Sequence, residues 1–184
     1  MVTTNAKRRT SNRLIKVKAK DSVKSLITSE LSYLKKAQIL MLGNNKRIAE
    51  LSRYFYDNYK KARITILSFS KKELLGAINA TSRFGSIRYA YSKDVYTGLS
   101  EDEFGLIVSY GTFDNIGNNR AISILRELYR ISKPNGIVII IGNNIDYLYK
   151  HYNKSNFSSC EIIENKGLRY LKLVKVNEIS LLPQ

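Results

Sequence analysis

The sequence predicts an α/β fold whose sheet is mostly parallel and covered by helices on both faces. Short apolar runs typical of buried strands alternate with segments whose apolar residues recur at helical spacing. The chain then changes pattern and ends in two strand-like runs around "ENKG", which predict an antiparallel hairpin. These observations together predict a seven-stranded sheet with its hairpin at the C-terminal end.

The strands before the hairpin are expected to be parallel. Strands separated by helices form right-handed βαβ units, and buried parallel strands are nearly continuous in apolar residues. Five segments have this character: "AQILMLG" (37–43), "ARITILSF" (62–69), "SIRYAYS" (86–92), "FGLIVSY" (104–110) and "GIVIII" (136–141). The hairpin strands are expected within residues 157–176.

Four segments are predicted to be helices with one apolar face each. The first spans residues 21–36 behind a cap at Asp21 or Ser22. The others span residues 46–59, 71–82 and 119–132. Since no low-complexity linker interrupts this order, we predict a basic arm over residues 1–20 and one α/β domain over residues 21–184.

Positive charge is the strongest global feature of the chain. It has 31 Lys and Arg against 15 Asp and Glu, a net charge of +16, which favours polyanionic partners and RNA first among them. Residues 1–20 contain no acid, and the cations there are the candidate nucleic-acid-binding residues. They are Lys7, Arg8, Arg9, Arg13, Lys16, Lys18 and Lys20. Three interpretations of this arm stay open: a phosphate-binding arm, an organellar transit peptide, or a solvated tail.

Several classes of function are excluded by composition. The longest apolar run, residues 136–142, is far shorter than the roughly 20 residues of a membrane helix, so no membrane partner is expected. One cysteine, Cys160, and one histidine, His151, leave no cluster for zinc and no basis for a serine-histidine-aspartate triad. We expect a cytoplasmic protein, or a mitochondrial one if the arm is a transit peptide.

Two long segments match a known family. "ISILRELYRISKPNGIVIIIG" (122–142) is similar to a helix, Lys-Pro-Gly-Gly turn and fifth strand, with Asn135 in place of one glycine. "EDEFGLIVSYGTFDNI" (101–116) is similar to the fourth strand and following loop of the same family. Over roughly residues 37–176 the chain resembles the class I S-adenosylmethionine-dependent methyltransferases, with a pattern like methyltransferase type 11. The resemblance implies a three-layer Rossmann-like methyltransferase fold.

The resemblance also implies where S-adenosylmethionine would bind, at a degenerate motif. The family's first strand ends in an acid and a glycine-rich turn, where backbone approaches the cofactor closely. In "MLGNNKR" the acid is replaced by Met41, the first glycine is kept as Gly43, and the next two become Asn45 and Arg47. The family's acid after strand two falls on Ser68, and its acid after strand three falls on Ser92, with Asp94 as a substitute. The implied cofactor-binding residues are Gly43, Asn44, Asn45, Ser68, Ser92 and Asp94.

The loop after the fourth strand is where the family places residues against the methyl group and the substrate. The catalytic candidates there are Tyr110, Phe113 and Asp114. The alternative for Tyr110 and Phe113 is a structural role as aromatic residues that close the edge of the sheet. The loop lacks the Asn/Asp-Pro-Pro-Tyr/Phe signature of methyltransferases that act on base or amide nitrogen, so that chemistry gains no support. No metal is implied.

Tyrosines and cations are interleaved in four stretches: "RYFYDNYKKAR" (53–63), "RYAYSKDVY" (88–96), "YLYKHYNK" (147–154) and "RYLK" (169–172). Tyrosine rings can stack on bases while cations hold phosphates. The competing interpretation is that these tyrosines are the amphipathic rims of helices and strands.

Two functions therefore compete. The favoured one is a methyltransferase-fold protein that is non-catalytic or weakly active and serves as an RNA-binding scaffold in a ribonucleoprotein, with a protein partner. The alternative is an active, divergent methyltransferase acting on RNA or an RNA-associated protein; a Rossmann-type oxidoreductase is a third, weaker interpretation because G-x-G-x-x-G is absent. A cofactor position filled by bulky side chains would favour the scaffold, and an open cleft the enzyme.

The tripeptide Gly-Asn-Asn begins at positions 43, 117 and 142, each time ahead of a helix-like run of residues. We interpret the glycine as the sharp turn and the asparagine as the helix cap.

Overall fold

The computed structural model describes residues 24–25, 27–29, 38–43, 45–59, 61–165 and 168–176. The arm over residues 1–20 lies outside these ranges, so its three interpretations stay predictions. Of the leading helix, residues 24–25 and 27–29 are described and are helical. None of the helices within the described ranges is long and apolar enough to cross a membrane.

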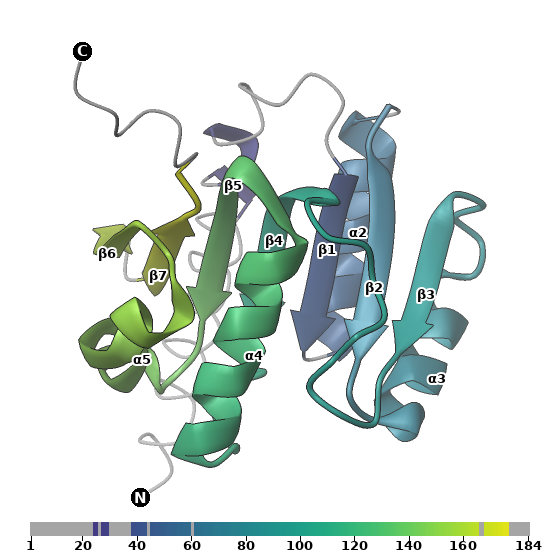
Figure 1. Ribbon diagram of the computed structural model, residues 1–184. Helices are drawn as coiled ribbons and strands as arrows, with labels where there is room; N and C mark the ends of the chain where they lie inside the picture. Colours follow the sequence, from purple (N-terminus) through teal and green to yellow (C-terminus); the bar gives the residue numbers. More distant parts are fainter. Residues whose placement is uncertain are drawn as a thin grey trace, which may run out of the picture.

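Seven strands form one sheet in the order β3-β2-β1-β4-β5-β7-β6 (Figure 1). Strands β1 to β5 pair in parallel, and β7 runs antiparallel to both β5 and β6, which confirms the predicted sheet and hairpin. The strands are β1 (Gln38–Gly43), β2 (Arg63–Ser68), β3 (Ile87–Tyr91), β4 (Phe104–Tyr110), β5 (Ser132–Ile141), β6 (Ser159–Asn165) and β7 (Leu168–Val174). The helices are α2 (Asn45–Asn58), α3 (Lys71–Thr81), α4 (Asn118–Ile131), α5 (Ile145–His151) and the 3-10 helix η1 (Tyr152–Ser155).

The sheet is covered on both faces, because successive side chains of a strand point to opposite sides. In β1, Ile39 and Met41 pack with α2 and α3, whereas Leu40 and Leu42 pack with α4 and α5. Figure 1 shows α4 and α5 in front of the sheet and α2 and α3 behind it. The near-continuous apolar sequence of β1 follows from this burial on two faces.

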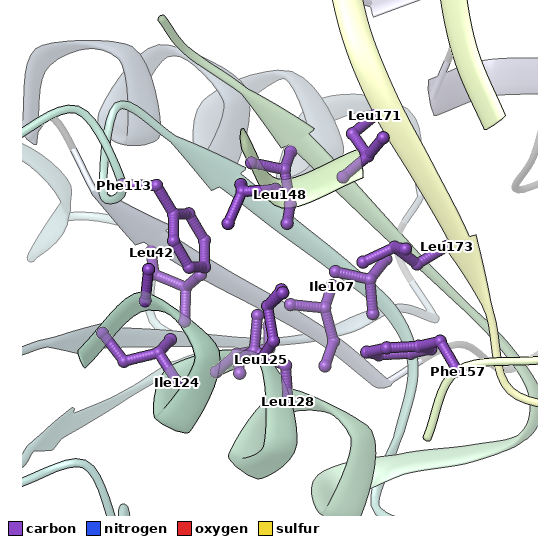
Figure 2. Packing of buried hydrophobic residues seen from close by; sticks show 14 of the residues in the cluster. Leu42, Ile107, Phe113, Ile124, Leu125, Leu128, Leu148, Phe157, Leu171 and Leu173 are labelled. Atoms are coloured by element: carbon purple, nitrogen blue, oxygen red, sulfur yellow. The ribbon is translucent and has the colours of Figure 1, made fainter. Parts of the chain in front are cut away.

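The core on the α4 side joins elements from both halves of the chain (Figure 2). Helix α4 contributes one apolar stripe at helical spacing, and the hairpin contributes side chains from β7. The residues labelled in Figure 2 are Leu42, Ile107, Phe113, Ile124, Leu125, Leu128, Leu148, Phe157, Leu171 and Leu173. Because burying one such side chain contributes about 1.5–3 kcal/mol, this cluster fixes the position of α4 on the sheet.

Strand β5 begins earlier than the sequence predicts. Ser132 already pairs with Phe104, an irregularity follows, and regular pairing resumes at Ile137 opposite Leu106. Asn135 stands within this irregularity at φ 61°, where the resembling family has glycine. Asparagine is among the few residues that adopt this conformation readily, so the substitution preserves the turn.

The connection from β3 to β4, residues 92–103, contains neither helix nor strand. It is held to α4 by Glu127, whose carboxylate accepts hydrogen bonds from the backbone and hydroxyl of Thr97 at 2.9 and 2.5 Å. Arg130 pairs with Glu127 and donates to the carbonyl of Leu99 at 2.7 Å. Burial alone would raise the pKa of Glu127, but hydrogen bonds from Arg130 and Thr97 outweigh it and lower that pKa below its ordinary value. The carboxylate therefore stays ionised at neutral pH.

The three Gly-Asn-Asn copies do not share one capping device. Gly43 makes the predicted sharp turn at φ 115°, but Gly117 has φ −65° and is itself the N-cap of α4, without a side-chain cap. Asn144 is the N-cap of α5 but makes no side-chain bond to that helix; its amide donates to the carbonyl of Phe113 at 3.4 Å. The capping interpretation is thus wrong for the second and third copies. In the second copy the N-cap residue is the glycine, and in the third copy the asparagine side chain bonds to a neighbouring loop instead of to the helix.

Candidate functional site

An open cleft of about 630 Å³ lies at the carboxyl ends of β1, β2 and β4. Its walls are Gly43, residues 67–70 with Glu73, residues 110–112 and 114–117 of the loop after β4, and Arg120 and Ile124 of α4. The chain proceeds from β1 to β2 on one side, whereas β4 follows β3 and pairs with β1 on the other side. In parallel α/β sheets, ligands bind in the crevice at such a switch point.

Gly43 is the last residue of β1 and lies in close contact with the loop that follows β4. A Cβ atom at Gly43 would lie 2.0 Å from the carbonyl oxygen of Tyr110 and 2.9 Å from Oγ1 of Thr112. Its φ of 115° is also one that side chains rarely adopt. Glycine is therefore required here by the close approach of two backbone segments at the cleft wall.

A carboxylate lies beside the end of β2 although Ser68, the residue at that end, has none. Ser68 is buried, and its hydroxyl lies 3.3 Å from Oε2 of Glu73, in the first turn of α3. The same hydroxyl contacts the carbonyl of Ser70 at 3.0 Å and accepts the backbone N–H of Ser70 at 3.1 Å. Glu73 itself is exposed on the cleft wall, so its carboxylate keeps acceptor capacity for a ligand.

The loop over residues 110–117 contributes two further polar groups. Oγ1 of Thr112 is buried and has no hydrogen-bond partner among the described residues. Asp114 accepts the backbone N–H of Asn143 at 2.6 Å, and a Cβ at Gly142 would lie 2.3 Å from the same carboxylate oxygen. Asp114 therefore fastens the loop after β4 to the loop after β5, while it also lines the cleft.

Two aromatic candidates of this loop have different surroundings. Tyr110 is half-buried and lines the cleft, with the guanidinium of Arg47 at 5.9 Å from its ring centre. Phe113 is 1% exposed and packs in the core among Leu42 and Ile124 (Figure 2). Phe113 is not among the residues that line the cleft; it anchors the loop in the core between the sheet and α4.

No family model and no curated protein matches the chain. Solved structures do match it, among them a SAM-dependent methyltransferase from Aquifex aeolicus with a TM-score of 0.66 and 12% identity, covering 82% of this chain and 87% of that one. The fold is that of the class I S-adenosylmethionine-dependent methyltransferases.

Two larger structures with this methyltransferase fold are also similar. The CurJ carbon methyltransferase has a TM-score of 0.69 and 9% identity over 86% of this chain. PigF, solved with SAH, has a TM-score of 0.63 and 16% identity over 78% of this chain. This chain spans only 54% and 51% of those two proteins. At these identities the likeness concerns the fold, not the activity.

The residues at the methyltransferase motif positions have clear local roles. Met41 is fully buried, and its sulfur accepts the Ser52 hydroxyl at 3.2 Å. Ser92 is buried and donates to the carbonyls of Asp94 and Tyr96 at 2.8 and 2.7 Å. The structure thus brings Gly43, Ser68, Tyr110 and Asp114 together at the cleft, whereas Ser92 and Asp94 are not among its lining residues. Asn44 lies outside the described residues, and Asn45 is the first residue of α2.

Glu73, Thr112 and Arg120 line the cleft and were not singled out from the sequence. A signal for Glu73 existed, because "SKKE" (70–73) has the Ser-x-x-Glu spacing of a capping box. Ser70 is indeed the N-cap of α3 and accepts the backbone N–H of Glu73. The motif predicts the start of a helix, and its glutamate, Glu73, lies at the cleft.

Cys160 and His151 lie apart from this cleft. Cys160 is half-buried in β6, and its burial raises the thiol pKa to about 12. His151 ends α5 with its ring 4.5 Å from that of Tyr147. Among the described residues, no group of three or more His, Cys, Asp or Glu could hold a metal.

Proposed function

We propose that the chain binds S-adenosylmethionine in the cleft between β1, β2 and β4 and acts as a divergent methyltransferase on RNA or an RNA-associated protein. The observation that supports this is the open cleft with the Glu73 carboxylate on its wall. Its volume of about 630 Å³ lies within the roughly 300–1,000 Å³ of small-molecule sites. The cleft is open at the carboxyl ends of β1 and β2, where the resemblance implies the cofactor would bind.

The residues present fit this cofactor. Glu73 and Ser68 can accept hydrogen bonds from ribose hydroxyls, so the negative charge missing at the end of β2 comes from the first turn of α3. The buried Thr112 hydroxyl has no protein partner, and a polar ligand group would satisfy it. The cleft wall has the carboxylates of Glu73 and Asp114 and the guanidinium of Arg120. It can therefore pair with the positive and the negative groups of S-adenosylmethionine.

The bound cofactor would supply an electrophilic methyl group carried on a sulfonium. Methyl transfer needs mainly the alignment of an acceptor with that group, so a general base is not essential. Tyr110 presents an aromatic ring and a phenol at the cleft, and Asp114 presents a carboxylate fixed by Asn143. We assign both to the orientation of the methyl acceptor.

RNA is the proposed substrate class because of charge. A net charge of +16 on 184 residues attracts a polyanion at long range, and seven of the cations lie in residues 1–20. Neutralising phosphates with such cations gives affinity that depends on salt and not on sequence.

A second function is favoured by a separate observation. Neither Met41 nor Ser68 carries the acid found at these positions in the resembling family, and a charge-assisted hydrogen bond contributes about 1.5–3 kcal/mol. If Glu73 does not compensate, affinity for the cofactor falls by several orders of magnitude. The chain would then be an RNA-binding scaffold that acts with a protein partner.

Calorimetric titration with S-adenosylmethionine and S-adenosylhomocysteine tests the proposal. We expect dissociation constants of about 10 µM, equivalent to about 7 kcal/mol of binding free energy. A second assay follows transfer of an isotope-labelled methyl group to cellular RNA and to RNA-associated protein. Absence of binding at millimolar ligand would overturn the enzyme and leave the scaffold; binding without transfer to either substrate would overturn the proposed substrate class.

A further inference from the structure

A second hollow lies at the edge of the sheet opposite to the cleft. It has a volume of about 240 Å³ and is lined by Tyr56, Tyr59, Ala62, Ile64, Ser86 and Ile87. Ile64 and Ser68 are four residues apart on β2, which places the hollow about 13 Å from the cofactor cleft along the strand. This site is therefore separate from the one described above.

The hollow has an aromatic wall that its surroundings hold in place. The rings of Tyr56 and Phe84 lie 5.2 Å apart at an angle of 39°, and the guanidinium of Arg83 lies 5.3 Å from the Phe84 ring centre. Tyr59 packs against Phe55 with 5.9 Å between ring centres. Tyr56 is nonetheless 40% exposed, so part of its ring remains accessible from solvent.

Two cations adjoin this aromatic wall. Lys61 precedes the lining residue Ala62 in the chain, and Arg83 lies in the turn after α3 with its guanidinium over the Phe84 ring. Both residues are exposed, and neither forms an ion pair with another described residue. The nearby Asp57 forms an ion pair with Arg53, with 3.7 Å between Oδ2 of the aspartate and Nε of the arginine. The rim of the hollow thus has positive charge available for an anion.

We propose that this hollow binds one base of a single-stranded nucleic acid, with the flanking phosphates on Lys61 and Arg83. A base offers a planar face to Tyr56 and has an anion on either side, which matches both properties of the site. The volume is below the roughly 300–1,000 Å³ of sites for drug-sized ligands, so it suits a single ring system. An apolar side chain of a partner protein would fill the hollow but would leave the cations without an anion to bind.

Fluorescence anisotropy with a labelled single-stranded RNA and the full chain tests this proposal. Tyr56→Leu keeps apolar bulk but removes the aromatic face, whereas Tyr56→Phe keeps that face. Since a stacked base contributes about 1–3 kcal/mol, we expect Tyr56→Leu to weaken binding by about 5-fold or more. Tyr56→Phe and the control Tyr149→Leu, at a 44% exposed tyrosine of α5, should stay within about twofold of wild type. Equal affinities of Tyr56→Leu and Tyr149→Leu would overturn the site.

The cations are tested separately with Lys61→Gln and Arg83→Gln combined. For a single strand each lost phosphate contact lowers the salt slope by about 0.7, so the double variant should lower it by about 1.4. An unchanged slope would overturn the assignment of phosphates to these two cations.

A cross-linking experiment does not require any variant to fold. Wild-type chain irradiated with RNA containing 4-thiouridine should give adducts on the peptide that contains Tyr56 and Tyr59. Adducts confined to other peptides would refute the site, and competition by an acidic peptide but not by a second RNA would assign the hollow to a protein instead. These outcomes do not depend on S-adenosylmethionine binding, so they separate this proposal from the proposed function.

Discussion

The hydroxyl of Ser68 lies 3.3 Å from the carboxylate of Glu73. The residue at the end of β2 therefore lacks a charge but contacts one that comes from the next helix. In a capping box the glutamate accepts the N–H of the cap residue, but here the N–H of Ser70 is taken by Ser68. Because Ser68 accepts the Ser70 N–H in place of Glu73, the Glu73 carboxylate contacts the Ser68 hydroxyl instead and lies at the wall of the cleft.

Glu73→Gln should weaken binding of S-adenosylmethionine and S-adenosylhomocysteine by about 10-fold. The lost interaction is a charge-assisted hydrogen bond of about 1.5 kcal/mol, the lower end of the range because Glu73 is exposed. Glu161→Gln, at an exposed glutamate of β6, is the matched control and should bind as wild type does. Calorimetry on the three proteins checks this; equal affinities would exclude Glu73 from the cofactor site.

Gly43→Ala should destabilise the whole fold by about 3 kcal/mol or more. The added Cβ would lie 2.0 Å from a backbone oxygen, and φ would stay at 115° only under strain. Gly85→Ala is the control, because a Cβ there has no heavy atom within 4 Å, and it should change stability by less than about 0.5 kcal/mol. Urea unfolding compares the two; a Gly43→Ala protein as stable as wild type would show that the loop after β4 moves away freely.

The fold was predictable because its signals are local. Residues 104–110 do not alternate between polar and apolar residues and are apolar except for Ser109, and this is what a strand buried on two faces requires. Helix α4 shows its apolar stripe at helical spacing, and the same side chains form the core in Figure 2. The start of β5 was missed because Ser132 enters the sheet before an irregularity that only the register with Phe104 reveals.

The cleft was only partly predictable because its wall depends on distances between segments far apart in sequence. Gly43 could be found from its turn, but not its contact with Tyr110. Glu73 looked like an ordinary capping residue, and Phe113 looked like a substrate contact until its burial was known. Spacing in the sequence identifies a helix start; it does not say which cleft the helix start borders.

The link between α4 and residues 92–103 should make stability depend on pH. The pKa of Glu127 is lowered from its ordinary value of 4.5, so the carboxylate stabilises the fold above that pH and the contribution is lost as pH falls through the lowered pKa. Glu127→Gln should cost about 1.5–3 kcal/mol at pH 7. Urea unfolding between pH 7 and pH 3 should show the difference between variant and wild type shrinking below 4.5. A constant difference would mean that the charge of Glu127 does not contribute.

Cys160 should react slowly with alkylating reagents in the folded protein. Burial raises the pKa of its thiol to about 12, so the reactive thiolate is scarce at pH 8. Iodoacetamide labelling followed by mass spectrometry should be at least about 10-fold slower than in urea-unfolded chain. Fast labelling of the folded chain would contradict the half-burial of Cys160 in β6.

Deleting residues 1–20 should lower affinity for RNA and flatten its dependence on salt. The segment has seven cations and no acid, and each phosphate contact on a single strand contributes about 0.7 to the salt slope. The slope should therefore fall by up to about 5, while the effect of Tyr56→Leu persists in the shortened chain because stacking does not need the arm. Anisotropy titrations at several salt concentrations measure both quantities. An unchanged slope after deletion would refute the phosphate-binding interpretation of the arm and leave the transit peptide or the solvated tail.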